Sequence, residues 1–127
     1  LEIRFFDAMP WEWLEVAVSL IAALTADATA TRLALEAVAP AARPGREAWC
    51  RAAQRGMTDP DLRAAATALF DIALEAAPRL PRGYLPDGAA ARLAAYGERF
   101  PAAGRCPADE LLEHHRADPD NVTPWLV

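Results

Sequence analysis

The spacing of apolar residues changes after the first few positions of the chain. Over residues 1–6 the odd positions are apolar, whereas the even positions include Glu2 and Arg4. Such an alternation with period two is typical of a half-buried β-strand. After Pro10 the apolar residues recur every three or four positions, which is typical of α-helices. The pattern therefore predicts one N-terminal strand followed by helices.

Helical spacing predicts six helices between residues 8 and 118. Their approximate bounds are 10–24, 27–38, 47–55, 58–77, 89–100 and 106–118. Start and stop signals support these bounds: Pro10 suits a first helical turn, Asp27 and Thr58 suit N-caps, and Gly56 suits the position after a helix end. Three prolines and two glycines in residues 78–88 predict a loop.

The first helix is the most apolar segment of the chain. Residues 16–24 (VAVSLIAAL) are apolar on nearly every side, so we expect a helix that is buried all round. This run has about half of the ~20 residues that a membrane span requires. Trp11, Trp13 and Trp49 are likewise expected to pack in the core.

Composition and charge narrow the class of protein. The chain has 127 residues, of which 54% are hydrophobic and 24% charged, as in one domain with a modest core. Its net charge of −5 and its lack of a basic run argue against a nucleic-acid partner. No signal-like segment or membrane span is apparent, so we expect no membrane partner and a cytoplasmic location. The two cysteines, Cys50 and Cys106, are far apart and are expected to be free thiols.

The last predicted helix offers a weak candidate site. Cys106, Glu110 and His114 are four residues apart and would share one face of a continuous helix, where a metal ion could bind. Pro107 places Cys106 at or before the helix start, however, which favours an ordinary, partly exposed face. A thiol close to a helix N-terminus could also have a lowered pKa and serve redox chemistry. His115 points about 100° away from its neighbour and is expected to be solvated.

Three stretches resemble a known family. They are LEIRFFDAMP, WCRAAQRGMTDPDLRAAATALFDIALEAAPRL and YGERFPAAGRCPADELL. The first is similar to the pattern L-E-x-R-x-x-D-x-x-P in a late core strand of glutamate-cysteine ligases of the glutamine-synthetase-like superfamily. The other two resemble the C-terminal helical region of the actinobacterial branch that serves ergothioneine biosynthesis.

This resemblance implies a fold and a domain organisation. The chain would be a mostly α fragment of an α+β enzyme, with one N-terminal core strand followed by five or six packed helices. Residues 1–127 would form the C-terminal portion of a single catalytic domain, with a strand at 1–7, a helical region at 8–118 and a tail at 119–127. The main sheet and the nucleotide-binding segments are expected in an N-terminal part that precedes Leu1.

The resemblance also implies a reaction and its residues. The family joins the γ-carboxylate of glutamate to the amine of cysteine through a γ-glutamyl phosphate, using ATP and Mg²⁺. Glu2 would be a Mg²⁺ ligand, and Arg4 would be catalytic and hold an ATP phosphate or the substrate carboxylate. Strand spacing would put the two side chains about 6.6 Å apart on one face. Asp7 and Pro10 also match the pattern, but structural roles are favoured for both, as an Asp that ends a strand and a Pro that starts a helix.

Two alternatives remain open. Glu2 and Arg4 could be a solvent-facing ion pair of little energetic value. The chain as a whole could be a non-enzymatic helical interaction module whose first strand pairs with another protein. The paired opposite charges favour the ligase, because a binding module has no need of them there. In either case we expect the chain alone to lack ligase activity.

Overall fold

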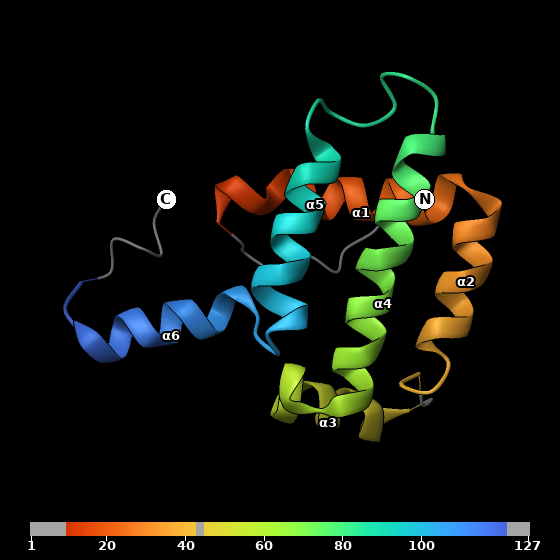
Figure 1. Cartoon of the computed structure of the whole chain (residues 1–127). Helices are drawn as coiled ribbons and strands as arrows, with labels where there is room; N and C mark the ends of the chain where they lie inside the picture. Colours follow the sequence, from red (N-terminus) through yellow and green to blue (C-terminus); the bar gives the residue numbers. More distant parts are fainter. Residues whose placement is uncertain (1–9, 43–44, 122–127) are drawn as a thin grey trace.

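The computed structural model describes residues 10–42 and 45–121, which form six α-helices and four short helical turns (Figure 1). The α-helices are α1 Leu14–Ala26, α2 Ala28–Val38, α3 Arg46–Arg55, α4 Pro60–Ala76, α5 Ala89–Gly97 and α6 Pro107–Ala117. The turns are η1 Trp11–Trp13, η2 Gly56–Thr58, η3 Ala77–Arg79 and η4 Glu98–Ala102. The predicted helical region is therefore confirmed, whereas the predicted strand lies outside the described residues.

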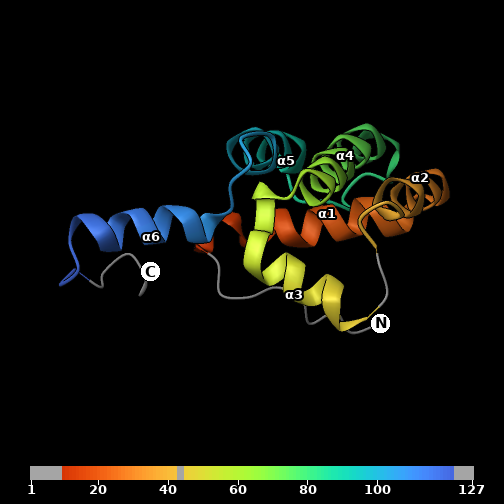
Figure 2. The ribbon, with the colours of Figure 1, turned by 90° about the horizontal axis from the view of Figure 1, so that it is seen from below.

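Helix α1 crosses one side of a layer formed by α2, α4 and α5. In Figure 1 these three helices lie side by side with α1 running across them, and Figure 2 shows all three on the same side of α1. Helix α6 extends away from this layered body. The described residues thus form a layered body from which α6 projects, with α3 beside the start of α4.

Small side chains allow the helices to approach closely in one half of the core. Ala23, Ala30, Ala73 and Ala76 are fully buried where α1, α2 and α4 meet. The other half contains larger residues, with Val16 and Phe70 packed against Leu93. Full burial of a side chain as large as that of Leu93 contributes roughly 1.5–3 kcal/mol.

The structure corrects the expected start of α4. Asp59, not Thr58, is the N-cap, because its Oδ1 accepts hydrogen bonds from the backbone N–H groups of Asp61 (3.1 Å) and Leu62 (3.2 Å). The cause is Pro60, which occupies the first helical position and forces the residue before it into an extended conformation. The Thr58 hydroxyl instead donates to the Arg55 carbonyl oxygen at 2.6 Å.

The expectation that α1 is buried on every side is also wrong. Val18 is 60% exposed, and Trp11, just before α1, is 79% exposed. Trp49 is 73% exposed, so of the three tryptophans expected in the core only Trp13 packs against it. Among the described residues α1 packs on α2, α4 and α5 along one side, and its opposite side is left exposed although it too is apolar.

Helix α5 ends in a widened turn that its apolar pattern did not reveal. After Gly97 the backbone forms the π-type turn η4, which contains Pro101. Proline lacks an N–H group and its ring clashes with the carbonyl of residue i−4, so the regular helix cannot continue. Phe100 is 1% exposed at this turn, which anchors the end of α5 in the core.

No single helix within residues 10–42 and 45–121 has both the length and the hydropathy to cross a bilayer. Residues 11–26 and 28–38 would satisfy that test only as a pair, and the two segments meet at an angle of 106°.

Candidate functional site

The predicted ligase residues lie outside the described part of the chain. Glu2, Arg4 and Asp7 precede residue 10, so their roles stay predictions. Pro10 is described: it precedes η1 in an extended conformation (φ −52°, ψ 138°), and its carbonyl accepts the Trp13 N–H at 2.9 Å. In the sequence, the described residues nearest to the predicted site are Pro10 and η1.

An aromatic cluster holds η1 against α4, α5 and η4. The Trp13 ring meets Tyr96 and Phe100 edge-on, with centroid distances of 5.3 and 5.8 Å. Tyr96 also stacks on Phe70 of α4 at 5.2 Å. Aromatic pairs of this kind contribute about 0.5–1.5 kcal/mol each beyond area burial. The backbone that follows the predicted strand is therefore fixed to the helical body.

Arg99 connects this cluster to the projecting helix α6. Its guanidinium lies over the Trp13 ring at 5.6 Å and donates two hydrogen bonds of 2.9 Å to the Glu110 carboxylate. The guanidinium lowers the pKa of Glu110, and burial raises the pKa of Tyr96. Both shifts favour the forms already present at neutral pH, a carboxylate and a neutral phenol, so the cluster is a structural anchor rather than an acid–base pair.

The redox and metal hypotheses for Cys106 are not supported. Cys106 is the N-cap of α6, as expected, and its N–H donates to the Asp109 carboxylate at 2.7 Å. Burial raises the pKa of its thiol, which is the opposite of the lowering that the redox hypothesis requires. The Glu110 carboxylate is already in an ion pair with Arg99. No group of three or more potential metal ligands occurs among residues 10–42 and 45–121. His114 and His115 are exposed, as expected.

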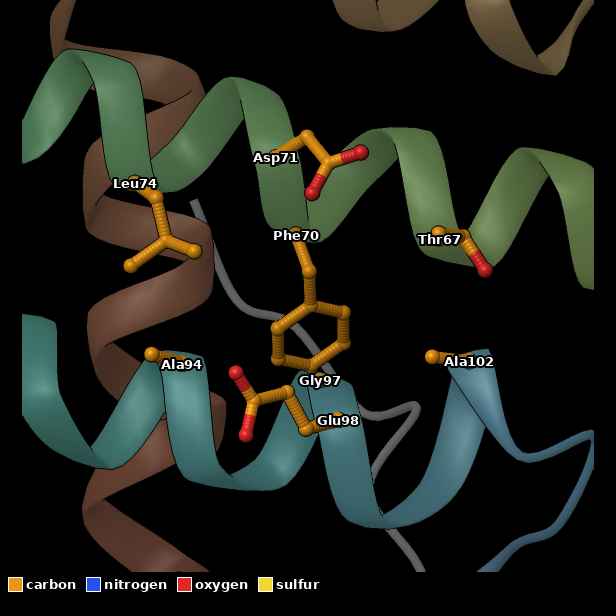
Figure 3. A pocket seen from close by; sticks show the side chains of 8 residues that line it. All are labelled: Thr67, Phe70, Asp71, Leu74, Ala94, Gly97, Glu98 and Ala102. Atoms are coloured by element: carbon orange, nitrogen blue, oxygen red, sulfur yellow. The ribbon is translucent and has the colours of Figure 1, made fainter.

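A small cavity of about 130 Å³ lies between α4 and the α5–η4 segment (Figure 3). Its lining consists of Thr67, Phe70, Asp71, Leu74, Ala94, Gly97, Glu98 and Ala102. Figure 3 shows the carboxylates of Asp71 and Glu98 on opposite helices, with the Phe70 ring between them. Two carboxylates would repel a phosphate. The cavity is therefore unsuited to ATP.

A wider hollow of about 500 Å³ lies between α3 and the start of α4. Arg51 lines it. The Arg51 guanidinium forms ion pairs with the carboxylates of Asp59 (3.7 Å) and Asp61 (3.5 Å) and donates a hydrogen bond to the Ala41 carbonyl oxygen at 3.2 Å. Its cationic group is thus engaged by neighbouring acids and is not free to bind a phosphate. The sequence reasoning missed this cluster, for which the Asp-Pro-Asp segment at the start of α4 was the available signal.

These sites together limit what the described residues can do. Phosphoryl transfer needs hard oxygen ligands for a divalent metal and cationic donors aimed at the transferring oxygens. Residues 10–42 and 45–121 contain no metal-ligand cluster, and the two hollows described above carry acidic groups or an already paired arginine. A third hollow of about 490 Å³ is lined by Asp71 and by Arg63, whose guanidinium donates to the Ala102 carbonyl oxygen. The described helices thus provide a scaffold that follows the predicted site in the sequence.

Comparison with known proteins gives a consistent assignment. The family described as glutamate-cysteine ligase family 2 matches residues 1–123. A protein named glutamate–cysteine ligase EgtA from Mycolicibacterium smegmatis is 40% identical over 78 residues, which are 61% of this chain and 18% of that protein. The protein of the same name from Mycobacterium tuberculosis (strain H37Rv) is 37% identical over 113 residues, which are 89% of this chain and 23% of that protein. The chain thus spans about a fifth of the length of these relatives, and no solved structure matches it.

Proposed function

Because the chain belongs to glutamate-cysteine ligase family 2, we propose that it carries Glu2 and Arg4 into the catalytic centre of an ATP-dependent ligase. That enzyme joins the glutamate γ-carboxylate to the amine of cysteine and supplies ergothioneine biosynthesis in the cytoplasm. The observation that carries the proposal is the family match over residues 1–123, which includes both charged residues. The same match disfavours a non-enzymatic interaction module.

The reaction has two steps. The γ-carboxylate oxygen attacks the γ-phosphorus of ATP, so a new P–O bond forms, ADP leaves and a γ-glutamyl phosphate results. The cysteine amine then attacks the acyl carbon, inorganic phosphate leaves, and the amine nitrogen loses a proton as the amide forms. The first step brings two anions together, and the second develops negative charge on the acyl oxygen and the leaving phosphate, so a fixed guanidinium is of direct use in both. We assign that role to Arg4, whose planar fork grips two oxygens of a phosphate or carboxylate.

Glu2 is our candidate ligand for Mg²⁺, which would neutralise charge on the phosphates when bound. The described residues contain no group of three or more potential metal ligands, and we expect the other ligands to come from the remainder of the ligase and from the ATP phosphates. The aromatic cluster around Trp13 supports this arrangement, because it fixes the backbone eleven positions after Glu2. The helical body thus positions the segment rather than reacting itself.

The proposal is tested by measuring ADP release that depends on both glutamate and cysteine. A complete ligase that contains this chain is expected to release ADP and to form γ-glutamylcysteine. The 127-residue chain alone is expected to release none, because one carboxylate and one guanidinium cannot hold the metals, the nucleotide and two amino acids together. Substrate-dependent ADP release by the chain alone would overturn the division of labour proposed here. If the complete protein released no ADP in the presence of glutamate and cysteine, the assigned reaction would be overturned.

A further inference from the structure

A stripe of exposed apolar side chains follows the outer face of η1 and α1. Trp11 is 79% exposed, Leu14 40% and Val18 60%. These residues are three and four positions apart and so share one face of the helical segment. The opposite face is buried in the core, where Val16 is 2% and Ala23 0% exposed. Segment η1–α1 therefore has two apolar faces, and the described helices cover one of them.

The stripe has the character of an interface. Ala22 and Thr25 continue it along α1, and Glu15 borders it about 60° from Val18 around the helix axis. The nearest acid, Glu15, is drawn toward the body by Arg92 of α5, with a distance of 2.6 Å between Oε2 and Nη2. Single exposed apolar residues are ordinary, but an aligned, uncharged set with a tryptophan marks a surface for another element.

The open face lies opposite the layer formed by α2, α4 and α5. Figure 2 shows these three helices on one side of α1. An element that covers the stripe would therefore make α1 the middle of three layers. Such a middle helix must be apolar all round, as the VAVSLIAAL run is.

We propose that this stripe is the surface on which the β-sheet of the ligase packs, with residues 1–6 as one of its strands. The proposal rests on the proposed function, since the remainder of the ligase must supply the other strands. Only residues 7–10 separate the predicted strand from η1, and consecutive elements joined so briefly are usually adjacent in space. The apolar face of that strand and the stripe on α1 each need an apolar partner.

A sheet fits the stripe better than the other occupants. A single strand would leave its backbone N–H and C=O groups unpaired, and residues 10–42 and 45–121 contain no strand to pair with it. The matched segments cover only 18% and 23% of the two relatives, which leaves ample sequence for further strands in proteins of that length. A second copy of α1 would cover the stripe but leave the apolar face of the sheet in water.

Hydroxyl-radical footprinting of two tryptophans tests the contact. Trp11 and Trp49 are similarly exposed, at 79% and 73%, so both are expected to be oxidised at comparable rates in the 127-residue chain. In the complete ligase we expect the ratio of Trp11 to Trp49 oxidation to fall several-fold. An unchanged ratio would overturn the proposal. The proposal would also be overturned if a dimer formed and both the dimer and the protection of Trp11 disappeared on dilution, because that result assigns the stripe to a second copy.

Matched lysine substitutions give an independent readout. Val18→Lys places a charge on the stripe, and Leu35→Lys places one at a site on α2 that is 67% exposed. Neither should lower the thermal stability of the chain alone. In the complete ligase only Val18→Lys should lower the melting temperature, because only that charge would be buried. Equal melting temperatures for the two variants would overturn the contact.

These measurements separate the two proposals. Protected Trp11 in a complete protein without ligase activity would contradict the function and leave the docking surface intact. Exposed Trp11 in a protein that forms γ-glutamylcysteine would contradict the docking surface alone.

Discussion

Arg79 donates two hydrogen bonds to the Asp27 carboxylate, although the two residues are 52 positions apart in the sequence. Its Nε donates to Oδ2 at 3.0 Å and its Nη2 to Oδ1 at 3.2 Å. The same Oδ1 accepts the Ala30 N–H at 2.7 Å as the N-cap of α2. One carboxylate therefore starts α2 and fastens it to η3, directly after α4. The guanidinium and the backbone N–H together lower the pKa of Asp27 from 3.8 to about 2.

The ion pair predicts a pH-dependent contribution to stability. The folded-state pKa of Asp27 is lowered, so its contribution is fully present above pH 3.8 and is lost as the pH falls toward about 2. Asp27→Asn removes the charge but keeps a good N-cap. We expect this variant to be less stable than the parent at pH 6 and the difference to shrink to a small part of that value as the pH falls to about 2, as measured by urea unfolding across that range.

Arg32→Gln is the matched control for this experiment. Arg32 pairs with Glu36 at 2.8 Å, but both side chains are 61% exposed, and such surface pairs contribute little. Its stability should follow that of the parent protein at every pH. If Asp27→Asn behaved in the same way, the link between α2 and η3 would carry no stability.

The N-cap of α4 gives a second prediction: substitutions of the neighbouring residues Asp59 and Thr58 should differ sharply in their effect on the free energy of unfolding. Asp59→Ala removes the Oδ1 atom that accepts hydrogen bonds from two backbone N–H groups. It also removes the carboxylate charge close to Arg51. The substitution should therefore lower the free energy of unfolding by about 1–2 kcal/mol. Thr58→Ala removes one exposed hydrogen bond to a carbonyl and should cost about 0.5 kcal/mol or less. Denaturant unfolding of both variants measures the difference. Equal costs would show that Asp59 does not cap the helix.

Gly97 in α5 offers a stabilising substitution. Its backbone is helical (φ −56°), and an added Cβ would lie 3.4 Å from Phe70 Cβ, an ordinary contact. Gly97→Ala should therefore raise the free energy of unfolding by about 0.5–1 kcal/mol through helix propensity. The same urea measurement detects the gain. A loss of stability would mean that the cavity beside Phe70 cannot accept even one methyl group.

The two cysteines should differ in reactivity. Cys50 is exposed, whereas Cys106 is half-buried and burial raises the pKa of its thiol. Because the thiolate is the reactive form, Cys50 should be alkylated by iodoacetamide clearly faster than Cys106 at pH 7.5. Mass spectrometry of timed samples gives both rates in one experiment. Faster labelling of Cys106 would restore the redox hypothesis.

Local chemistry explains which features of the fold were predictable. The Asp27 cap and the Cys106 start of α6 depend on nearby residues and were predicted correctly, as was the end of α3 at Gly56. The Thr58 prediction failed because it overlooked that Pro60 selects the residue before it as the cap. Such local signals placed the starts of α2, α4 and α6 and the end of α3 to within two residues.

Features that depend on distant packing were not predictable in the same way. Apolar composition alone placed Trp11 and Trp49 in the core, but exposure depends on which helices lie beside them. The pair of Asp27 and Arg79 joins residues with no periodic relation in the sequence. For the candidate site, the Glu2 and Arg4 motif came from family resemblance, and the structure adds only the anchored scaffold next to it.

The last prediction concerns these two residues in the complete ligase. Arg4→Lys keeps a positive charge but loses the planar fork that holds two oxygens together, so turnover should fall by about 10²-fold while the protein stays folded. Arg4→Ala should lose more. If Arg4 stabilises charge that grows in the transition state, the loss falls mainly on kcat. A loss confined to the KM for glutamate would mean that Arg4 only holds the substrate carboxylate.

Glu2→Gln is the companion variant, because it preserves shape and removes the charge of the proposed ligand. Its defect should shrink as Mg²⁺ is raised if metal affinity is what was lost. Circular dichroism of each variant verifies that the helical body is intact. Wild-type rates for both Arg4→Lys and Glu2→Gln would identify an ordinary surface ion pair, and the catalytic centre would then have to be sought elsewhere in the enzyme, even though the chain still belongs to the same family.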